Sequence, residues 1–83
     1  GQYSLNYIFH KFMEGEQKGL RGQLMKILLD DLAPEAKLRL YAETGQEYFD
    51  EWAKGAVEVL EQHDMEWIKE NQPAMWIYLQ MVE

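Results

Sequence analysis

The segment from Glu47 to His63 constrains the fold of this chain most strongly, because it has the pattern of a long amphipathic helix. Its apolar residues recur at intervals of three and four, and its acidic residues recur at the same intervals on the opposite side. With about 100° of rotation per residue, the two sets occupy separate arcs. The apolar set is Tyr48, Phe49, Trp52, Ala53, Ala56, Val59, Leu60 and His63, and the acidic set is Glu47, Asp50, Glu51, Glu58 and Glu61. The rest of the chain is expected to pack against the apolar side.

The N-terminal residues predict a first helix that places Leu5, Ile8, Phe9, Phe12 and Met13 on one side. Ser4 is a suitable N-cap for this helix, and Gly15 is a natural end. Residues 3–9 also alternate in polarity, which would suit a strand, but Ile8 interrupts the alternation and favours the helix.

Residues 16–22 contain or adjoin three glycines among charged residues, and we expect a loop or a frayed helix start there. The following residues, from Leu20 to Leu32, predict a second helix whose apolar arc covers about 200°. Such a helix needs to be covered on more than one side. It should end near Ala33, because the residue before Pro34 is disfavoured in helical geometry.

Residues 34–46 leave two alternatives open. Leu38, Tyr41 and Ala42 predict a third helix that opens at Pro34. They lie in phase with the apolar side of residues 47–63, which permits a single helix from Pro34 to His63. Thr44, followed three residues later by Glu47, has instead the pattern of a capping box and predicts a break or kink near Gly45.

The chain must turn after His63, because the apolar phase is lost there. Asp64 is a suitable cap for a short helix ending near Asn71, and Pro73 is suited to open a last element. Residues 74–82 are almost wholly apolar and fit a helix or a strand, although the neighbouring helices favour a helix. We therefore predict one all-α domain over residues 1–83, a compact bundle of four to five short helices that a second copy of the chain could complete.

Charge and composition exclude several classes of function. The net charge is −7: residues 1–26 hold four basic and two acidic residues, whereas the remaining 57 hold four basic and thirteen acidic ones. An acidic surface repels phosphates, so direct nucleic-acid binding is not expected. The chain has no cysteine, no apolar run of about 18 residues and no N-terminal signal pattern, and we expect a soluble cytoplasmic protein without membrane contact.

The sequence contains few candidate catalytic residues. His10 and His63 are the only histidines, and neither belongs to a zinc-binding pattern. Asp64 beside His63 could orient a general base, but a partly buried histidine at a helix end is the simpler interpretation. Phosphate-binding and calcium-binding loops are also absent from the sequence. We predict no enzyme, no cofactor and no metal.

The ordered acidic residues suggest a first candidate binding surface. A solvent-exposed helix surface explains them most simply, and a docking face for a basic partner is the functional alternative. This predicted acidic face consists of Glu43, Glu47, Asp50, Glu51, Glu58 and Glu61.

The eleven aromatic residues suggest a second candidate surface, since they exceed what so small a core easily hides. They could all fill one core, but exposed apolar surface is typical of protein interfaces and of symmetric dimers. The predicted apolar interface consists of Val57, Met65, Ile68, Trp76 and Tyr78. The function predicted from these features is a non-catalytic protein-binding or regulatory module, whose partner is another protein or a second copy. The alternative is an acidic nucleic-acid mimic that inhibits a nucleic-acid-binding protein.

Overall fold

The computed structural model describes residues 2–82, and this part of the chain contains five α-helices, one 3-10 turn and no β-strand. The prediction of a small all-α bundle is confirmed. The elements are α1 (Gln2–Glu14), α2 (Gly19–Leu32), the 3-10 turn η1 (Pro34–Ala36), α3 (Gly45–Gln62), α4 (Met65–Asn71) and α5 (Pro73–Val82).

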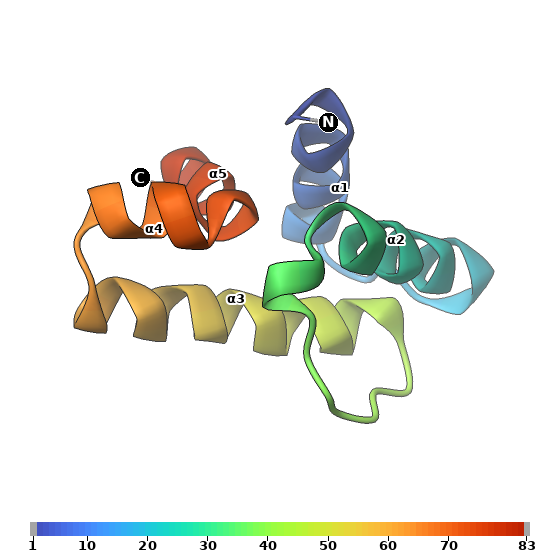
Figure 1. The fold of residues 1–83 in the computed structure, drawn as a ribbon. Helices are drawn as coiled ribbons and strands as arrows, with labels where there is room; N and C mark the ends of the chain where they lie inside the picture. The colour runs from blue at the N-terminus through green and yellow to red at the C-terminus, as the bar shows by residue number, and fades with distance from the viewer. Residues whose placement is uncertain (1, 83) are drawn as a thin grey trace.

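Helix α3 is the central support of the bundle. Its 18 residues extend over about 27 Å in a molecule measuring 35 × 25 × 22 Å. Figure 1 shows α1 and α2 above its N-terminal half, and α4 and α5 above its C-terminal half. Helix α5 also contacts α1 and α4, so its nearly continuous apolar sequence is covered on several sides.

The predicted apolar side of α3 supplies much of the core. Trp52 is fully buried, and its ring centroid lies 5.4 Å from that of Phe9 and 5.9 Å from that of Tyr78. Phe12 stacks on Phe49 at 4.6 Å. These contacts join α1, α3 and α5 through one aromatic cluster.

Two of the three predicted N-caps are confirmed. The Thr44 hydroxyl accepts a hydrogen bond from the backbone N–H of Glu47 at 3.1 Å, and the Asp64 carboxylate accepts one from Trp67 at 2.8 Å. The Ser4 cap is wrong, because α1 begins at Gln2 and includes Ser4 in its first turn. A helical backbone at Ser4 excludes the extended conformation that an N-cap requires.

The third helix predicted from Pro34 is also wrong, both as a separate helix and as a continuous one to His63, whereas the predicted break near Gly45 is confirmed. After η1, residues 37–44 are not helical, although their apolar residues are in phase with α3. Side chains of α3 accept hydrogen bonds from this segment: the Leu38 N–H donates to the Tyr48 hydroxyl at 2.9 Å, and the Glu43 N–H donates to the Glu47 carboxylate at 3.1 Å. These bonds replace intrahelical ones, so the segment is held without forming a helix.

Gly15 ends α1 as predicted, whereas the expected loop is shorter than residues 16–22, because α2 already begins at Gly19. Gly15 and Gly19 adopt positive φ angles of 89° and 71° at the two ends of the connection between α1 and α2, where a side chain would be strained. Gly22 instead lies inside α2 and is buried against Gly45 of α3. A Cβ atom on Gly45 would overlap the carbonyl group of Gly22. The two glycines therefore allow α2 and α3 to touch through their backbones.

Candidate functional site

The six residues of the predicted acidic face are all exposed. Five positions of α3 with alternating spacings of four and three form one row along the helix, and Lys54 occupies the middle position. Its ammonium group lies 3.2 Å from the Glu51 carboxylate. The row consists of Glu47, Glu51, Lys54, Glu58 and Glu61. The acidic row is thus interrupted at its centre by a cation.

The five residues of the predicted apolar interface differ in exposure. Val57 is half exposed, whereas Ile68 is completely buried in the core and presents no surface to a partner. The chain turns between α3 and α4, so the phase of α3 does not determine which side of α4 faces outwards. Trp76 is partly covered by Lys69, whose Nζ atom lies 4.9 Å from the indole ring. Met65 and Tyr78 are partly buried against the core.

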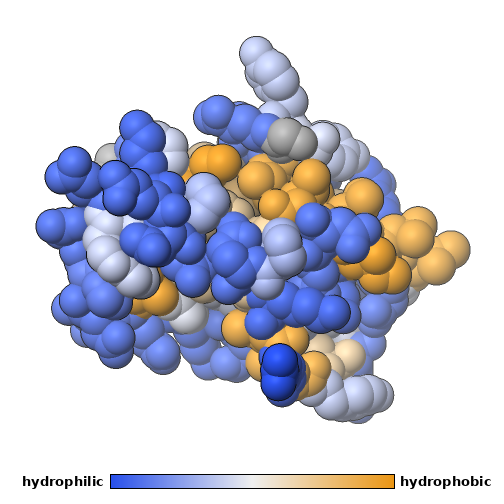
Figure 2. Space-filling model, in the orientation of Figure 1, coloured by the Kyte–Doolittle hydropathy of each residue, from blue (hydrophilic) through white to orange (hydrophobic). Residues whose placement is uncertain are grey.

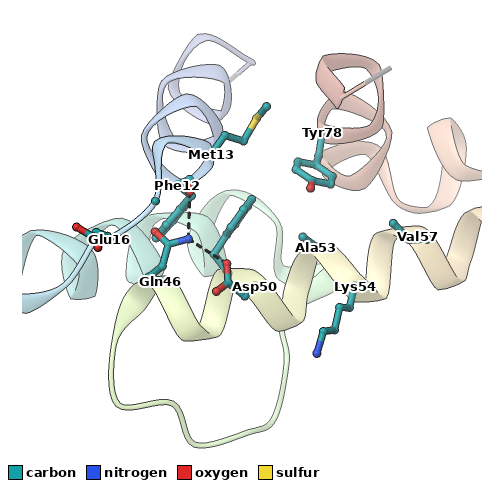
Figure 3. A pocket seen from close by; sticks show the side chains of 11 residues that line it. Phe12, Met13, Glu16, Gln46, Asp50, Ala53, Lys54, Val57 and Tyr78 are labelled. Carbon is teal, nitrogen blue, oxygen red and sulfur yellow. Dashed lines mark hydrogen bonds between the residues drawn. The ribbon is translucent and has the colours of Figure 1, made fainter.

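A groove of about 690 Å³ brings together three residues of the two predicted surfaces: Asp50, Val57 and Tyr78. Figure 3 shows Tyr78 of α5 pointing towards α3, while Lys54 points away from it. The remaining lining residues are Phe12, Met13, Gly15, Glu16, Gln46, Phe49, Ala53 and Lys54. Burial, together with the negative charge of Asp50, raises the pKa of the Tyr78 hydroxyl. The groove is lined mainly by apolar side chains, and the Tyr78 phenol is one of its polar groups.

Gln46 fixes one end of this groove. Its side-chain amide donates to the Phe12 carbonyl at 3.0 Å and to the Asp50 carboxylate at 2.9 Å, as the dashed lines in Figure 3 show. Its amide oxygen accepts from the backbone N–H of Gln17 at 3.0 Å, and its own backbone N–H donates to the Gln17 carbonyl at 3.1 Å. These bonds hold the end of α1, the following loop and the start of α3 together.

A polar cluster on the other side of α3 has a structural role. The Tyr48 hydroxyl donates to the Asp30 carboxylate at 2.5 Å, and the Lys26 ammonium lies 3.3 Å from the same carboxylate. Burial and the hydrogen bond to Asp30 raise the pKa of Tyr48 to about 12. All the polar groups are used in joining α2, α3 and Leu38, so this cluster offers no free group for chemistry.

His63, the candidate base, stacks on Trp67 with 3.5 Å between the ring centroids. The neighbouring Asp64 carboxylate accepts the N-terminal hydrogen bond of α4. These contacts give both side chains a structural part at the corner between α3 and α4. His10 is exposed on α1.

A group of exposed aliphatic residues on one side of α2 was not among the predicted sites. The exposed fraction is 76% for Leu20, 52% for Leu24, 50% for Ile27 and 49% for Leu28. We call these four residues the α2 face. Figure 2 shows hydrophobic residues gathered where Figure 1 places α1 and α2. The signal in the sequence was the wide apolar arc of this helix, of which the bundle covers only one side.

The surroundings of the α2 face are aromatic and basic. Tyr7 of α1 is half exposed, and its hydroxyl accepts a hydrogen bond from the Arg21 guanidinium at 2.9 Å. A shallow pocket of about 320 Å³ continues the face between the two helices and is lined by Tyr3, Ser4, Tyr7, Ile8 and Leu28. The α2 face thus extends onto α1 as one apolar surface bordered by a fixed cation.

Within residues 2–82, no helix has the length and apolar character needed to cross a membrane, and no three potential metal ligands of the types His, Cys, Asp and Glu form a cluster. Comparison with protein-family models, with curated proteins and with solved structures finds no match to the chain.

Proposed function

We propose that this chain is a non-catalytic protein-binding module and that the α2 face is its docking surface. The observation that supports this proposal is the exposure of four large aliphatic side chains on one side of a helix whose opposite side is buried. Isolated exposed apolar residues are ordinary, but contiguous ones are typical of surfaces that bind another protein.

Covering the α2 face contributes a modest free energy of binding. Fully burying a leucine contributes about 1.5–3 kcal/mol, so covering a half-exposed one contributes about 1 kcal/mol. The four residues of the α2 face together provide several kcal/mol, before the loss of translational and rotational freedom is subtracted. Binding through this face is therefore weak unless the partner also complements the charges beside it.

The groove beside Tyr78 is a less suitable docking surface. Phe12 and Phe49, which line it, are already buried and stack on each other in the core. A partner entering the groove would gain little new apolar contact from these rings. Leu20 and Leu24 offer more uncovered surface, which favours the α2 face.

Photo-crosslinking can test this proposal. One variant carries a photoreactive amino acid in place of Leu24. The other carries it in place of Glu58, which lies on the acidic row of α3. Both variants are irradiated in the source cell. We expect a covalent protein adduct, with the chain itself or with another protein, from position 24 only. The absence of any adduct at position 24, while circular dichroism shows a folded variant, would contradict the proposal.

The nucleic-acid mimic is the second candidate function, and the exposure of all six acidic residues favours it. Lys54 lies within the acidic row, where a phosphate mimic would place a negative charge. An adduct from position 58, lost when the neighbouring Glu47, Glu51 and Glu61 of the row are replaced by lysine, would support this function. Unchanged crosslinking in that triple variant would exclude it.

A further inference from the structure

We propose that a second copy of this chain covers the α2 face, with the two α2 helices packed antiparallel about a two-fold axis. This inference rests on the proposed function and identifies the partner of the same surface. It is based on the spacing of the exposed residues and on the distribution of charge along α2.

The spacing places an acid in line with the apolar residues. Leu20, Leu24, Ile27 and Asp31 follow one another at intervals of four, three and four, which puts them in one row along the helix. Asp31 is exposed, and the three ion pairs found within residues 2–82 do not include it. The apolar row therefore ends in an uncompensated carboxylate.

The charges of α2 oppose its own dipole. Arg21 lies in the first turn, near the positive end of the helix, and Asp31 lies in the last turn, near the negative end. The N-cap residue Lys18 also provides no side-chain acceptor for the first N–H groups. Each end of α2 would consequently be stabilised by the opposite end of another α2 helix.

An antiparallel pair satisfies these conditions at the same time. With the two-fold axis between positions 25 and 26, Leu24 lies opposite Ile27 of the second copy, and Leu20 lies opposite Asp31. The Asp31 carboxylate of each copy then lies beside Arg21 and the uncapped N-terminus of the other copy. A parallel pair would instead place Arg21 against Arg21 and Asp31 against Asp31, so charge selects the antiparallel arrangement.

The size of the surface sets the strength of this dimer. A helix of 14 residues is about 21 Å long, and a contact along it with the added area of Tyr3 and Tyr7 lies at or below the ~1,200 Å² of the smallest stable interfaces. We expect a dissociation constant of about 10–100 μM. A two-fold contact uses the same surface on both copies, so association stops at the dimer.

Sedimentation equilibrium of the purified chain, from 5 μM to 1 mM at low salt, tests the proposal. The wild-type chain should form a dimer, and Leu24→Glu should be monomeric throughout. Arg21→Asp and Asp31→Arg should each weaken dimerisation at least tenfold, because like charges then face each other. The double variant should recover dimerisation to within about threefold of the wild type. An equimolar mixture of the two single variants should form a heterodimer, although each variant alone dimerises weakly.

The charge variants also separate loss of dimerisation from loss of folding. Both substitutions place a charge favourable to the helix dipole at its end, so monomer stability measured by urea unfolding should be retained or increased. Failure of the double variant to recover, or dimerisation of both single variants at wild-type strength, would overturn the antiparallel arrangement. A wild-type chain that is monomeric at 1 mM would overturn the dimer. The proposed function would survive that result if the photoreactive residue at position 24 crosslinks to a different protein.

Discussion

The backbone contact between Gly22 and Gly45 makes a specific prediction about stability. In Gly45→Ala the new methyl group would overlap the carbonyl carbon and oxygen of Gly22, which are backbone atoms of a packed helix. The overlap can be relieved only if α2 and α3 move apart by about 1 Å or more. Overpacking of this kind typically costs about 1–3 kcal/mol.

A separation of the helices would also weaken the hydrogen bonds beside the contact. The backbone of Gln46 donates to the Gln17 carbonyl, and the Gln46 side chain accepts from the Gln17 N–H. Each such bond contributes about 1 kcal/mol net. Replacing glycine by alanine also lowers the conformational entropy of the unfolded chain, which stabilises the folded protein by at most about 1 kcal/mol. We therefore expect Gly45→Ala to lose about 2–4 kcal/mol of unfolding free energy.

Gly55→Ala is the matched control in the same helix. A Cβ atom at Gly55 would meet only the terminal methyl carbon of Met75 at 3.6 Å, which is an ordinary contact. This substitution should stabilise the protein by about 0.5–1 kcal/mol through helix propensity. Urea unfolding followed by circular dichroism measures both values, with the dependence on denaturant concentration checked for constancy. If Gly45→Ala were as stable as Gly55→Ala, the close approach of α2 and α3 would be refuted.

Three further predictions concern the core and the polar cluster. Trp52→Ala should lose about 3–5 kcal/mol, because it empties the centre of the aromatic cluster, and a loss below about 1 kcal/mol in urea unfolding would contradict the assigned core. Tyr48→Phe should lose about 1–3 kcal/mol at neutral pH, because the Leu38 N–H then lacks its acceptor; equal stability would show that the bond contributes nothing. The third prediction concerns high pH. The pKa of Tyr48 is raised from 10.0 to about 12, so protonated Tyr48 contributes to the free energy of unfolding. This contribution is at most about 3 kcal/mol; it is complete below pH 10 and is lost as the pH rises from 10 to 12. Unfolding measured across this range should show a smaller pH dependence in Tyr48→Phe than in the wild type.

The helix starts that depend on local chemistry were predictable from the sequence. Thr44 and Asp64 each precede a helix and bond to a backbone N–H three residues later. Such a cap needs only residues that are neighbours in the chain, so its pattern survives in the sequence. Ser4 has the same chemistry, but the residues before it continue the helix to Gln2. A cap residue therefore marks a helix start only where the residues before it do not themselves continue the helix.

The irregular segment over residues 37–44 was not predictable by the same means. Its apolar residues have helical spacing, but its conformation depends on a hydrogen bond to α3. The Tyr48 hydroxyl of that helix accepts this bond from the Leu38 N–H. Gly22 is a similar case. A glycine is required at this position only because Gly45 of α3 approaches it closely. Both features are contacts between segments, and a periodic pattern within one segment contains no information about them.

The position of the exposed apolar surface follows from a competition between two helices. Both α2 and α5 have wide apolar arcs, and a bundle of this size can surround only one of them. Helix α5 packs against α1, α3 and α4, whereas α2 packs against α1, α3 and η1 with one side only. Periodicity shows that both helices require covering, but it does not show which one occupies the enclosed position. The excess apolar surface was therefore predictable, but its location on the α2 face, rather than on the predicted residues Val57, Met65, Ile68, Trp76 and Tyr78, required the three-dimensional arrangement.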